Sequence, residues 1–192
     1  MRIGVLAAQG AFAEHVQTLA KLDVHAALVR LPEQLEGLDG LIIPGGESTT
    51  ISKLILAYGL RDAIRGNAEA GMAVFGTCAG MIMLAKSIVD GNGVQPLQLM
   101  DIAVRRNAFG RQIDSFETEL QIASVGDKPF HAVFIRAPLI EKAGPGVEVL
   151  SRLENGTIVA ARQGNILACS FHPELTEDTR LHRYFLKLAA GE

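Results

Sequence analysis

The chain has 192 residues, of which 48% are hydrophobic and 20% are charged, and its formal net charge is −3. This length suits one domain with a sizeable core, and the composition excludes a disordered or fibrous chain. The slight excess of acidic residues argues against a nucleic-acid-binding protein. We therefore expect a single domain that covers residues 1–192.

The cysteines and the N-terminal segment indicate the compartment. Cys78 and Cys169 lie in unlike contexts, which does not suggest a disulfide framework, so we expect a reducing compartment. The apolar start at residues 3–8 is too short for a signal peptide, and Gln9 interrupts it. No apolar run approaches the roughly 20 residues of a membrane span. These features predict a cytoplasmic protein.

The first half of the chain alternates strand-like with helix-like segments. Phe12, Val16 and Leu19, for example, have helical spacing. The expected strands cover residues 2–7, 26–30, 40–43 and 73–75, and the expected helices cover residues 11–22, 49–58, 60–70 and 79–87. This alternation predicts a largely parallel sheet with helices on both faces.

The second half of the chain consists of short strand-like segments separated by turn residues. Strands are expected at residues 102–106, 117–123, 132–136, 147–152, 157–163 and 166–171, and a closing helix at residues 176–189. No linker, repeat or low-complexity segment divides the chain. The predicted fold is one α/β domain, with a mostly parallel sheet and an antiparallel extension in the second half.

The segment around Cys78 carries the most specific signal. The sequence GTCAG at residues 76–80 follows an apolar strand and precedes a helix-favouring run. It matches the nucleophile elbow G-x-S-x-G with Cys in place of Ser, in which small residues let a sharp strand-to-helix turn close. The helix N-terminus would favour a thiolate there. A buried structural cysteine is the alternative, and we interpret Cys169, in an apolar strand, in that way.

A cysteine nucleophile needs a base and a group that orients the base. His172 and Glu174 are the best candidates, because Pro173 holds His172 extended and residues two apart in an extended chain face the same side. The imidazole could then serve the thiol through one nitrogen and donate the other N–H to the carboxylate. The alternative is a solvated strand end. We interpret four further histidines as structural or solvent-facing: His15, His25, His131 and His182.

A glycine-rich loop at residues 44–50 follows an expected strand and precedes an expected helix. The N–H groups of Gly46 and Ala79 would together form an oxyanion hole. The loop is also compatible with a plain strand-to-helix turn capped by Ser48 or Thr49. It lacks the Gly-Lys-Ser/Thr sequence of a phosphate-binding P-loop.

Three polar residues are further candidates for the same site. Gln9, at the end of the first strand, could hold the glycine-rich loop by hydrogen bonds, or it could be an ordinary polar residue at a helix start. Arg106 and Arg136 supply cations that an α-carboxylate or a negatively charged partner surface would need. A single surface arginine is more often simply solvated, so both interpretations remain open.

Together these segments resemble the class I, triad-type glutamine amidotransferases, and within them the glutaminase subunits of pyridoxal 5′-phosphate synthase. The matching stretches are GVL at 4–6, QG at 9–10, LIIPGGESTT at 41–50, FGTCAG at 75–80, RNAFGRQ at 106–112, SF at 115–116, VFIRAP at 133–138 and SFHPELTED at 170–178. The elbow with a distant His-Pro-Glu is typical of the triad-type amidotransferases in general. The PGGEST, RNAFGRQ and FIRAP segments narrow the resemblance to the glutaminase subunits.

The resemblance implies a flavodoxin-like α/β fold and the hydrolysis of L-glutamine to L-glutamate and ammonia. Cys78 would attack the amide and form a glutamyl thioester, His172 would shuttle protons, and Glu174 would orient His172. The implied substrate contacts are Gly46, Glu47, Ser48, Arg106, Ile135 and Arg136. The ammonia would pass to a separate (β/α)₈ synthase subunit in a large complex. Pyridoxal phosphate is then the partner's product, and we expect neither a cofactor nor a metal in this chain.

Other classes of protein fit part of the pattern. A cysteine hydrolase or peptidase of the same fold would keep the elbow and the histidine without needing the PGGEST loop or the two arginines. A non-enzymatic binding or regulatory subunit would have a thiol that does not react with a glutamine-like electrophile. A zinc site would require Cys169 to point at the elbow, beside Cys78, His172 and Glu174.

Overall fold

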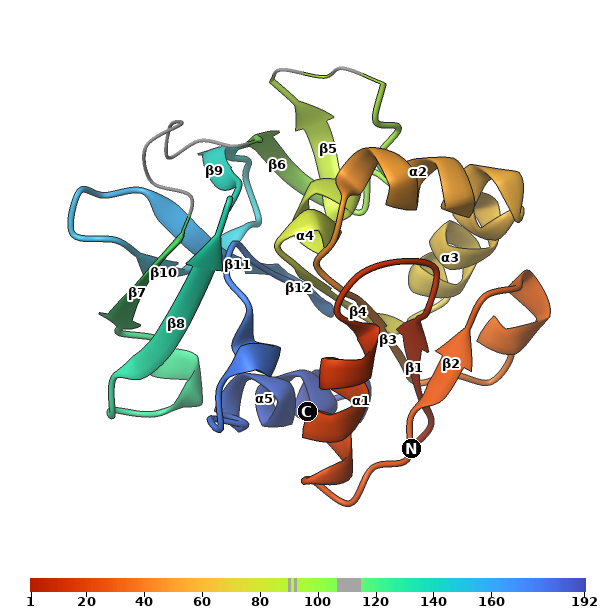
Figure 1. The fold of residues 1–192 in the computed structure, drawn as a ribbon, viewed down its shortest axis with the longest axis horizontal. Coiled ribbons are helices and arrows are strands. Elements are labelled where there is room, and N and C mark those ends of the chain that lie inside the picture. The colour runs from red at the N-terminus through yellow and green to blue at the C-terminus, as the bar shows by residue number, and fades with distance from the viewer. Residues whose placement is uncertain (90, 92, 107–114) are drawn as a thin grey trace.

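The structure is a computed structural model that describes residues 1–89, 91, 93–106 and 115–192 (Figure 1). Its strands are β1 (Ile3–Leu6), β2 (Ala27–Val29), β3 (Gly40–Ile43), β4 (Ala73–Thr77), β5 (Ala85–Ile88), β6 (Met100–Arg105), β7 (Ser115–Leu120), β8 (Phe130–Ile135), β9 (Leu139–Ala143), β10 (Glu148–Arg152), β11 (Ile158–Gln163) and β12 (Ile166–Cys169). The helices are α1 (Phe12–Ala20), α2 (Ser48–Ala57), α3 (Leu60–Glu69), α4 (Ala79–Leu84) and α5 (Arg180–Ala189), with short 3₁₀ turns η1 (Pro32–Leu35), η2 (Ala123–Val125) and η3 (Pro173–Leu175). None of the helices in these described ranges is long and apolar enough to cross a membrane.

Five adjacent strands form the parallel part of the large sheet, in the order β2-β1-β3-β4-β12. This is the strand order of flavodoxin-like folds, which bind ligands outside the carboxyl ends of the strands. The carboxyl ends of β1, β3, β4 and β12 lead into Gln9, Gly46, Cys78 and His172, respectively. The topology therefore brings four of the predicted site residues to one edge of the sheet.

The remaining strands supply the antiparallel extension. β11 pairs antiparallel with β12, β9 and β10, and β9 pairs antiparallel with β6. β5 closes the sheet in parallel with β6. β7 and β8 form a separate antiparallel pair, which stands beside α5 in Figure 1. The predicted fold class, a mostly parallel sheet flanked by helices with an antiparallel extension, is confirmed.

The parallel strands are buried on both faces. In β3, Leu41 and Ile43 belong to one hydrophobic cluster and Ile42 belongs to another, and all three are fully buried. Since successive side chains of a strand point to opposite faces, a sheet covered on both sides requires an unbroken apolar run. The first cluster includes side chains of α2, α3 and α4 and the second includes those of α1 and α5, which lie on opposite sides of the sheet in Figure 1.

Three expectations about elements were wrong. The helix predicted over residues 79–87 ends at Leu84, because residues 85–88 pair with β6 as a strand instead. β9 was not predicted, since only Ile140 of its side chains is buried and the strand lacks a clear apolar alternation. The closing helix begins at Arg180 rather than Thr176, and the Asp178 carboxylate accepts a hydrogen bond from the backbone N–H of Arg180, the first helical residue.

Candidate active site

Cys78 sits at the sharp turn between β4 and α4, as the elbow pattern predicts. Its backbone has φ 49° and ψ −106°, a conformation that non-glycine residues rarely adopt. The flanking glycines allow the turn to close: a Cβ on Gly80 would lie 1.9 Å from the Ile43 carbonyl oxygen, and one on Gly76 would lie 2.6 Å from the Gly80 backbone. Such local strain is characteristic of functional sites.

His172 and Glu174 lie next to this turn. The distance between His172 Nδ1 and Glu174 Oε1 is 2.6 Å, and the Glu174 side chain is fully buried. The expectation that Glu174 lies on an extended segment was wrong, because Pro173 begins the 3₁₀ turn η3 and Glu174 lies within it. The turn still directs the carboxylate to the imidazole.

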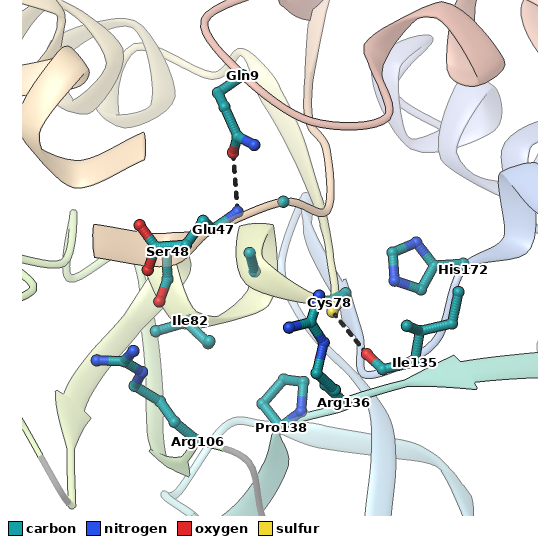
Figure 2. A pocket seen from close by; sticks show the side chains of 12 residues that line it. Gln9, Glu47, Ser48, Cys78, Ile82, Arg106, Ile135, Arg136, Pro138 and His172 are labelled. Atoms are coloured by element: carbon teal, nitrogen blue, oxygen red, sulfur yellow. Dashed lines mark hydrogen bonds between the residues drawn. The ribbon is translucent and has the colours of Figure 1, made fainter. Parts of the chain in front are cut away.

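The charge state of His172 depends on both neighbours. Burial favours the neutral imidazole, but hydrogen bonds and charge attraction from Cys78 and Glu174 outweigh burial and raise the pKa of His172 from 6.5 to about 10. An imidazolium between a thiolate and a carboxylate is the arrangement that activates a cysteine nucleophile. The Cys78 Sγ also lies 3.9 Å from the carbonyl oxygen of Ile135 (Figure 2).

Hydrogen bonds to neighbouring segments hold the glycine-rich loop in place. The Gly45 N–H donates to Thr77 Oγ1 at 3.1 Å, and the Gly45 carbonyl accepts from the Ala11 N–H at 3.0 Å. Gln9 Oε1 accepts the N–H of Glu47 at 2.8 Å, the bond drawn in Figure 2, so Gln9 does hold the loop. Since C=O and N–H of a trans peptide point in opposite directions, the bond to Ala11 fixes the direction of the Gly46 N–H.

Glu47 caps helix α2, a role that the sequence analysis gave to Ser48 or Thr49. Its carboxylate accepts hydrogen bonds from the N–H groups of Thr49 and Thr50 at 3.0 and 2.6 Å and from the Thr50 hydroxyl at 2.6 Å. The hydrogen bond from the Thr50 side chain is the main reason that the pKa of Glu47 falls to about 2. The Glu47 carboxylate is therefore committed to the helix N-terminus.

A pocket of about 360 Å³ opens in front of Cys78. It is lined by Gln9, Gly46, Glu47, Ser48, Cys78, Ala79, Ile82, Arg106, Ile135, Arg136, Pro138 and His172. The structure thus brings together every predicted site residue except Glu174, which lies buried behind His172. The pocket has the size and the mixed polar lining of a small-molecule site.

Two arginines give the pocket its positive charge. Arg106 and Arg136 both line it, on the side away from Gln9 in Figure 2. Arg136 has φ 42°, so its backbone is held in the left-handed region. The rest of the RNAFGRQ segment, residues 107–112, lies outside the described residues. Within the described ranges, no group of three His, Cys, Asp or Glu side chains is placed to hold a metal ion.

His15, which we expected to be structural or solvent-facing, is a buried structural residue, and it lies beside the triad. His15, in α1, is fully buried, and its Nε2 lies 3.4 Å from Glu174 Oε2 and 3.1 Å from Thr77 Oγ1. Its Nδ1 lies 2.9 Å from Nε2 of His182. A histidine in the first helix after β1 carries no sequence signal for a contact made 159 residues later, so only the fold reveals it.

Nearly the whole chain matches known proteins. A family model described as the SNO glutamine amidotransferase family matches residues 5–190. A curated relative from Herpetosiphon aurantiacus, pyridoxal 5′-phosphate synthase subunit PdxT, is 59% identical over 98% of this chain and 100% of its own. The protein of that name from Dehalococcoides mccartyi is 58% identical over 98% of this chain and 97% of its own.

Solved structures show a similar fold. A crystal structure of a glutamine amidotransferase has a TM-score of 0.94 and 54% identity, and the match covers 99% of this chain and 100% of that one. PurLQS from Thermotoga maritima has a TM-score of 0.69 at 16% identity, which shows a likeness of fold alone. On these matches and the elbow geometry, the chain belongs to the SNO glutamine amidotransferase family.

Proposed function

We propose that the chain hydrolyses L-glutamine to L-glutamate and ammonia with Cys78, His172 and Glu174 as its catalytic triad. The observation that carries this proposal is that Cys78 and His172 line one pocket at the carboxyl ends of β4 and β12, with the buried Glu174 carboxylate 2.6 Å from His172 Nδ1. The family supplies the substrate class, because its members transfer the amide nitrogen of glutamine.

The chemistry divides into two half-reactions. The Cys78 thiolate attacks the side-chain amide carbon, and the His172 imidazolium donates its proton to the departing nitrogen, so that ammonia leaves and a glutamyl thioester remains. Neutral His172 then takes a proton from water, the resulting hydroxide attacks the thioester, and glutamate is released with the thiolate restored. Glu174 keeps the Nδ1–H of His172 oriented through both steps.

Pocket residues divide between the two ends of the substrate. The N–H groups of Gly46 and Ala79 stabilise the oxyanion that forms on the amide carbon, with Gln9 supporting the loop. Arg106 and Arg136 attract the α-carboxylate, because they are the arginines among the pocket-lining residues. Ser48, Ile135 and the backbone of Glu47 complete the substrate contacts.

The ammonia passes to a synthase subunit. The relatives' name, a subunit of pyridoxal 5′-phosphate synthase, supports a partner that consumes it. Ammonia released into water is protonated and lost as a nucleophile, so a closed route between the subunits favours transfer. The hydrogen bond from Ala11 holds the Gly45–Gly46 peptide in one orientation in the isolated chain, and partner contacts are expected to raise kcat by selecting the orientation that is productive for catalysis. Pyridoxal phosphate is the partner's product and is not a cofactor of this chain.

Steady-state hydrolysis tests the proposal. Ammonia and glutamate release should be measured with glutamine and with short peptides, for the isolated chain and after addition of the synthase subunit. We expect the chain to hydrolyse glutamine but not the peptides, and we expect kcat to rise when the synthase subunit is added. Hydrolysis of peptides would indicate a peptidase of the same fold, whereas a thiol inert to glutamine with and without the partner would indicate a binding subunit.

A further inference from the structure

The Glu174 carboxylate lies between two histidines. Oε1 is 2.6 Å from His172 Nδ1, and Oε2 is 3.4 Å from His15 Nε2. The side chains of Glu174 and His15 have no exposed surface. Apart from the His15 contact, Oε2 has no hydrogen-bond partner among the described residues. A buried carboxylate oxygen is costly without a donor, so the proton on His15 decides how well this charge is held.

The hydrogen-bond partners decide where that proton is. His15 Nδ1 faces His182 Nε2 at 2.9 Å, and one of these two nitrogens must carry the hydrogen. Nδ1 of His182 is buried and has no partner in the described part of the chain. If His15 donated from Nδ1, neutral His182 would carry its hydrogen on that unpartnered Nδ1, and Glu174 Oε2 would have no donor. An orphaned buried N–H is rare in folded proteins.

The opposite assignment places a donor beside the buried charge. His182 then donates from Nε2 to His15 Nδ1, and His15 carries its hydrogen on Nε2. That N–H donates to Thr77 Oγ1 at 3.1 Å, and Glu174 Oε2 lies 3.4 Å from the same nitrogen, a longer electrostatic contact that is the nearest donor to this oxygen in the described structure. The costs are a lone pair on His182 Nδ1 without a donor and a buried Thr77 hydroxyl that accepts from both His15 and Gly45 and no longer donates to His15. Both groups are neutral, and a buried charged oxygen without a donor costs more.

We propose that His15 is a positioning residue of the triad, which holds the second oxygen of Glu174 as a neutral Nε2–H donor whose tautomer is set by His182. This inference rests on the proposed glutaminase function. A carboxylate held through both oxygens cannot rotate away from His172, so the imidazole keeps its Nδ1–H and turns Nε2 toward the thiol. Thr77 extends the array, because its hydroxyl oxygen also accepts the Gly45 N–H of the glycine-rich loop.

The proposal requires that the two histidines on Glu174 differ in charge. Burial, followed by the charges of His182 and His172, lowers the pKa of His15 well below 6.5, so His15 stays neutral. His172, in contact with Cys78, has a raised pKa and carries the mobile proton. A second imidazolium at His15 would compete for the charge of Glu174 and weaken its hold on His172.

Variants at position 15 separate positioning from packing. His15→Leu removes the donor, and His15→Gln keeps an N–H at a similar distance from the helix. For the full chain with its synthase subunit, we expect His15→Leu to lower kcat about 10- to 100-fold, the range for a lost hydrogen bond to a charged group. The KM for glutamine should change little, because His15 does not line the pocket. His15→Gln should recover most of the lost kcat.

A matched control lies one turn further along α1. Thr18 is buried and its hydroxyl donates to the Glu14 carbonyl, away from the triad, so Thr18→Val should lose stability without losing kcat. A wild-type kcat in His15→Leu, or a His15→Gln variant as slow as His15→Leu, would overturn the proposal.

Nitrogen NMR of histidine-labelled wild-type protein tests the contact without an activity assay. We expect His15 to be protonated on Nε2 and to remain neutral from about pH 6 to 8. An Nδ1–H tautomer or a charged His15 would overturn the proposal even if glutamine is hydrolysed. If glutamine is not hydrolysed by the wild type, the proposed function fails, whereas the spectrum still decides the tautomer.

Discussion

The N–H of Cys78 donates a hydrogen bond to the carbonyl of Cys169 at 2.9 Å. The two cysteines are neighbours because β4 and β12 run side by side in parallel. Their side chains nevertheless have different environments. Cys78 lines the pocket, whereas Cys169 has no exposed surface and its Sγ lies 3.4 Å from the Phe171 carbonyl oxygen. Burial raises the pKa of the Cys169 thiol well above its usual value, which keeps it protonated and unreactive.

This difference predicts opposite effects of the same substitution. Cys78→Ala should abolish glutamine hydrolysis, because no other thiol faces the pocket among its lining residues. Cys169→Ala should keep most of kcat and lose some stability from the small cavity it leaves. A glutamine-mimicking electrophile should label only the Cys78 peptide in digests of the wild type. Labelling of Cys169 would reverse the assignment of the nucleophile.

Glu174→Gln should lower kcat by about 10²- to 10⁴-fold and change KM less, because a neutral amide does not hold the Nδ1–H tautomer of His172. The measurement is steady-state hydrolysis with the synthase subunit present. Glu177→Gln is the matched control, since Glu177 is exposed and pairs only at the surface with Lys21 in the described structure. A Glu174→Gln variant with wild-type kcat would refute the orienting role.

Arg106→Ala and Arg136→Ala should each raise the KM for glutamine by about tenfold or more, as expected for a lost contact to the α-carboxylate. The rate at which a small neutral reagent alkylates Cys78 should not change, because the triad is intact. Arg105→Ala provides the control: Arg105 precedes Arg106 but does not line the pocket, and it pairs with Glu141 at 2.7 Å. If KM is normal in both pocket variants, the arginines do not bind substrate.

Stability should rise with pH between about pH 5 and 6.5. Burial lowers the pKa of His182 from 6.5 to about 4 and that of His15 well below 6.5. In this window the unfolded chain protonates both histidines while the folded protein leaves them neutral, so the unfolded state binds more protons. His172, with its raised pKa, is charged in both the folded and the unfolded state in this window. It makes stability fall with rising pH only above about pH 6.5, where the unfolded chain loses the proton and the folded protein keeps it.

Denaturant unfolding at several pH values checks this prediction. The slope of the free energy of unfolding against pH reports the number of protons taken up on unfolding. His182→Gln should lower that number by up to one, because it removes one titrating group. A wild-type stability that is flat over this window, or a slope that His182→Gln leaves unchanged, would show that these histidines are not kept neutral by folding.

The sequence predicted those parts of the site that depend on local pattern. The elbow at residues 76–80 depends on the small residues Gly76 and Gly80, whose lack of a Cβ lets the backbones approach. The parallel sheet followed from unbroken apolar strands separated by helices. Because the carboxyl ends of such strands meet at one edge, the separation of Gln9, Cys78 and His172 along the chain did not prevent their association.

The missed features depend on contacts between distant segments. Glu174 was expected on an extended chain, but Pro173 begins a 3₁₀ turn. Nothing near Glu47 indicated that its carboxylate, rather than the hydroxyl of Ser48 or Thr49, caps α2, because all three residue types suit helix N-termini. The contacts of His15 arise only when α1 packs beside η3, where the sequence offers no pattern.

The central claim is that Cys78 forms a glutamyl thioester during turnover. The most direct measurement is rapid acid quenching of the full chain, with its synthase subunit and saturating glutamine, followed by mass spectrometry of the digested chain. The account predicts one glutamyl group on the peptide that contains Cys78, formed at a rate no slower than kcat and absent from Cys78→Ala. A glutamyl group on any other residue, or glutamine hydrolysis that persists in Cys78→Ala, would contradict it.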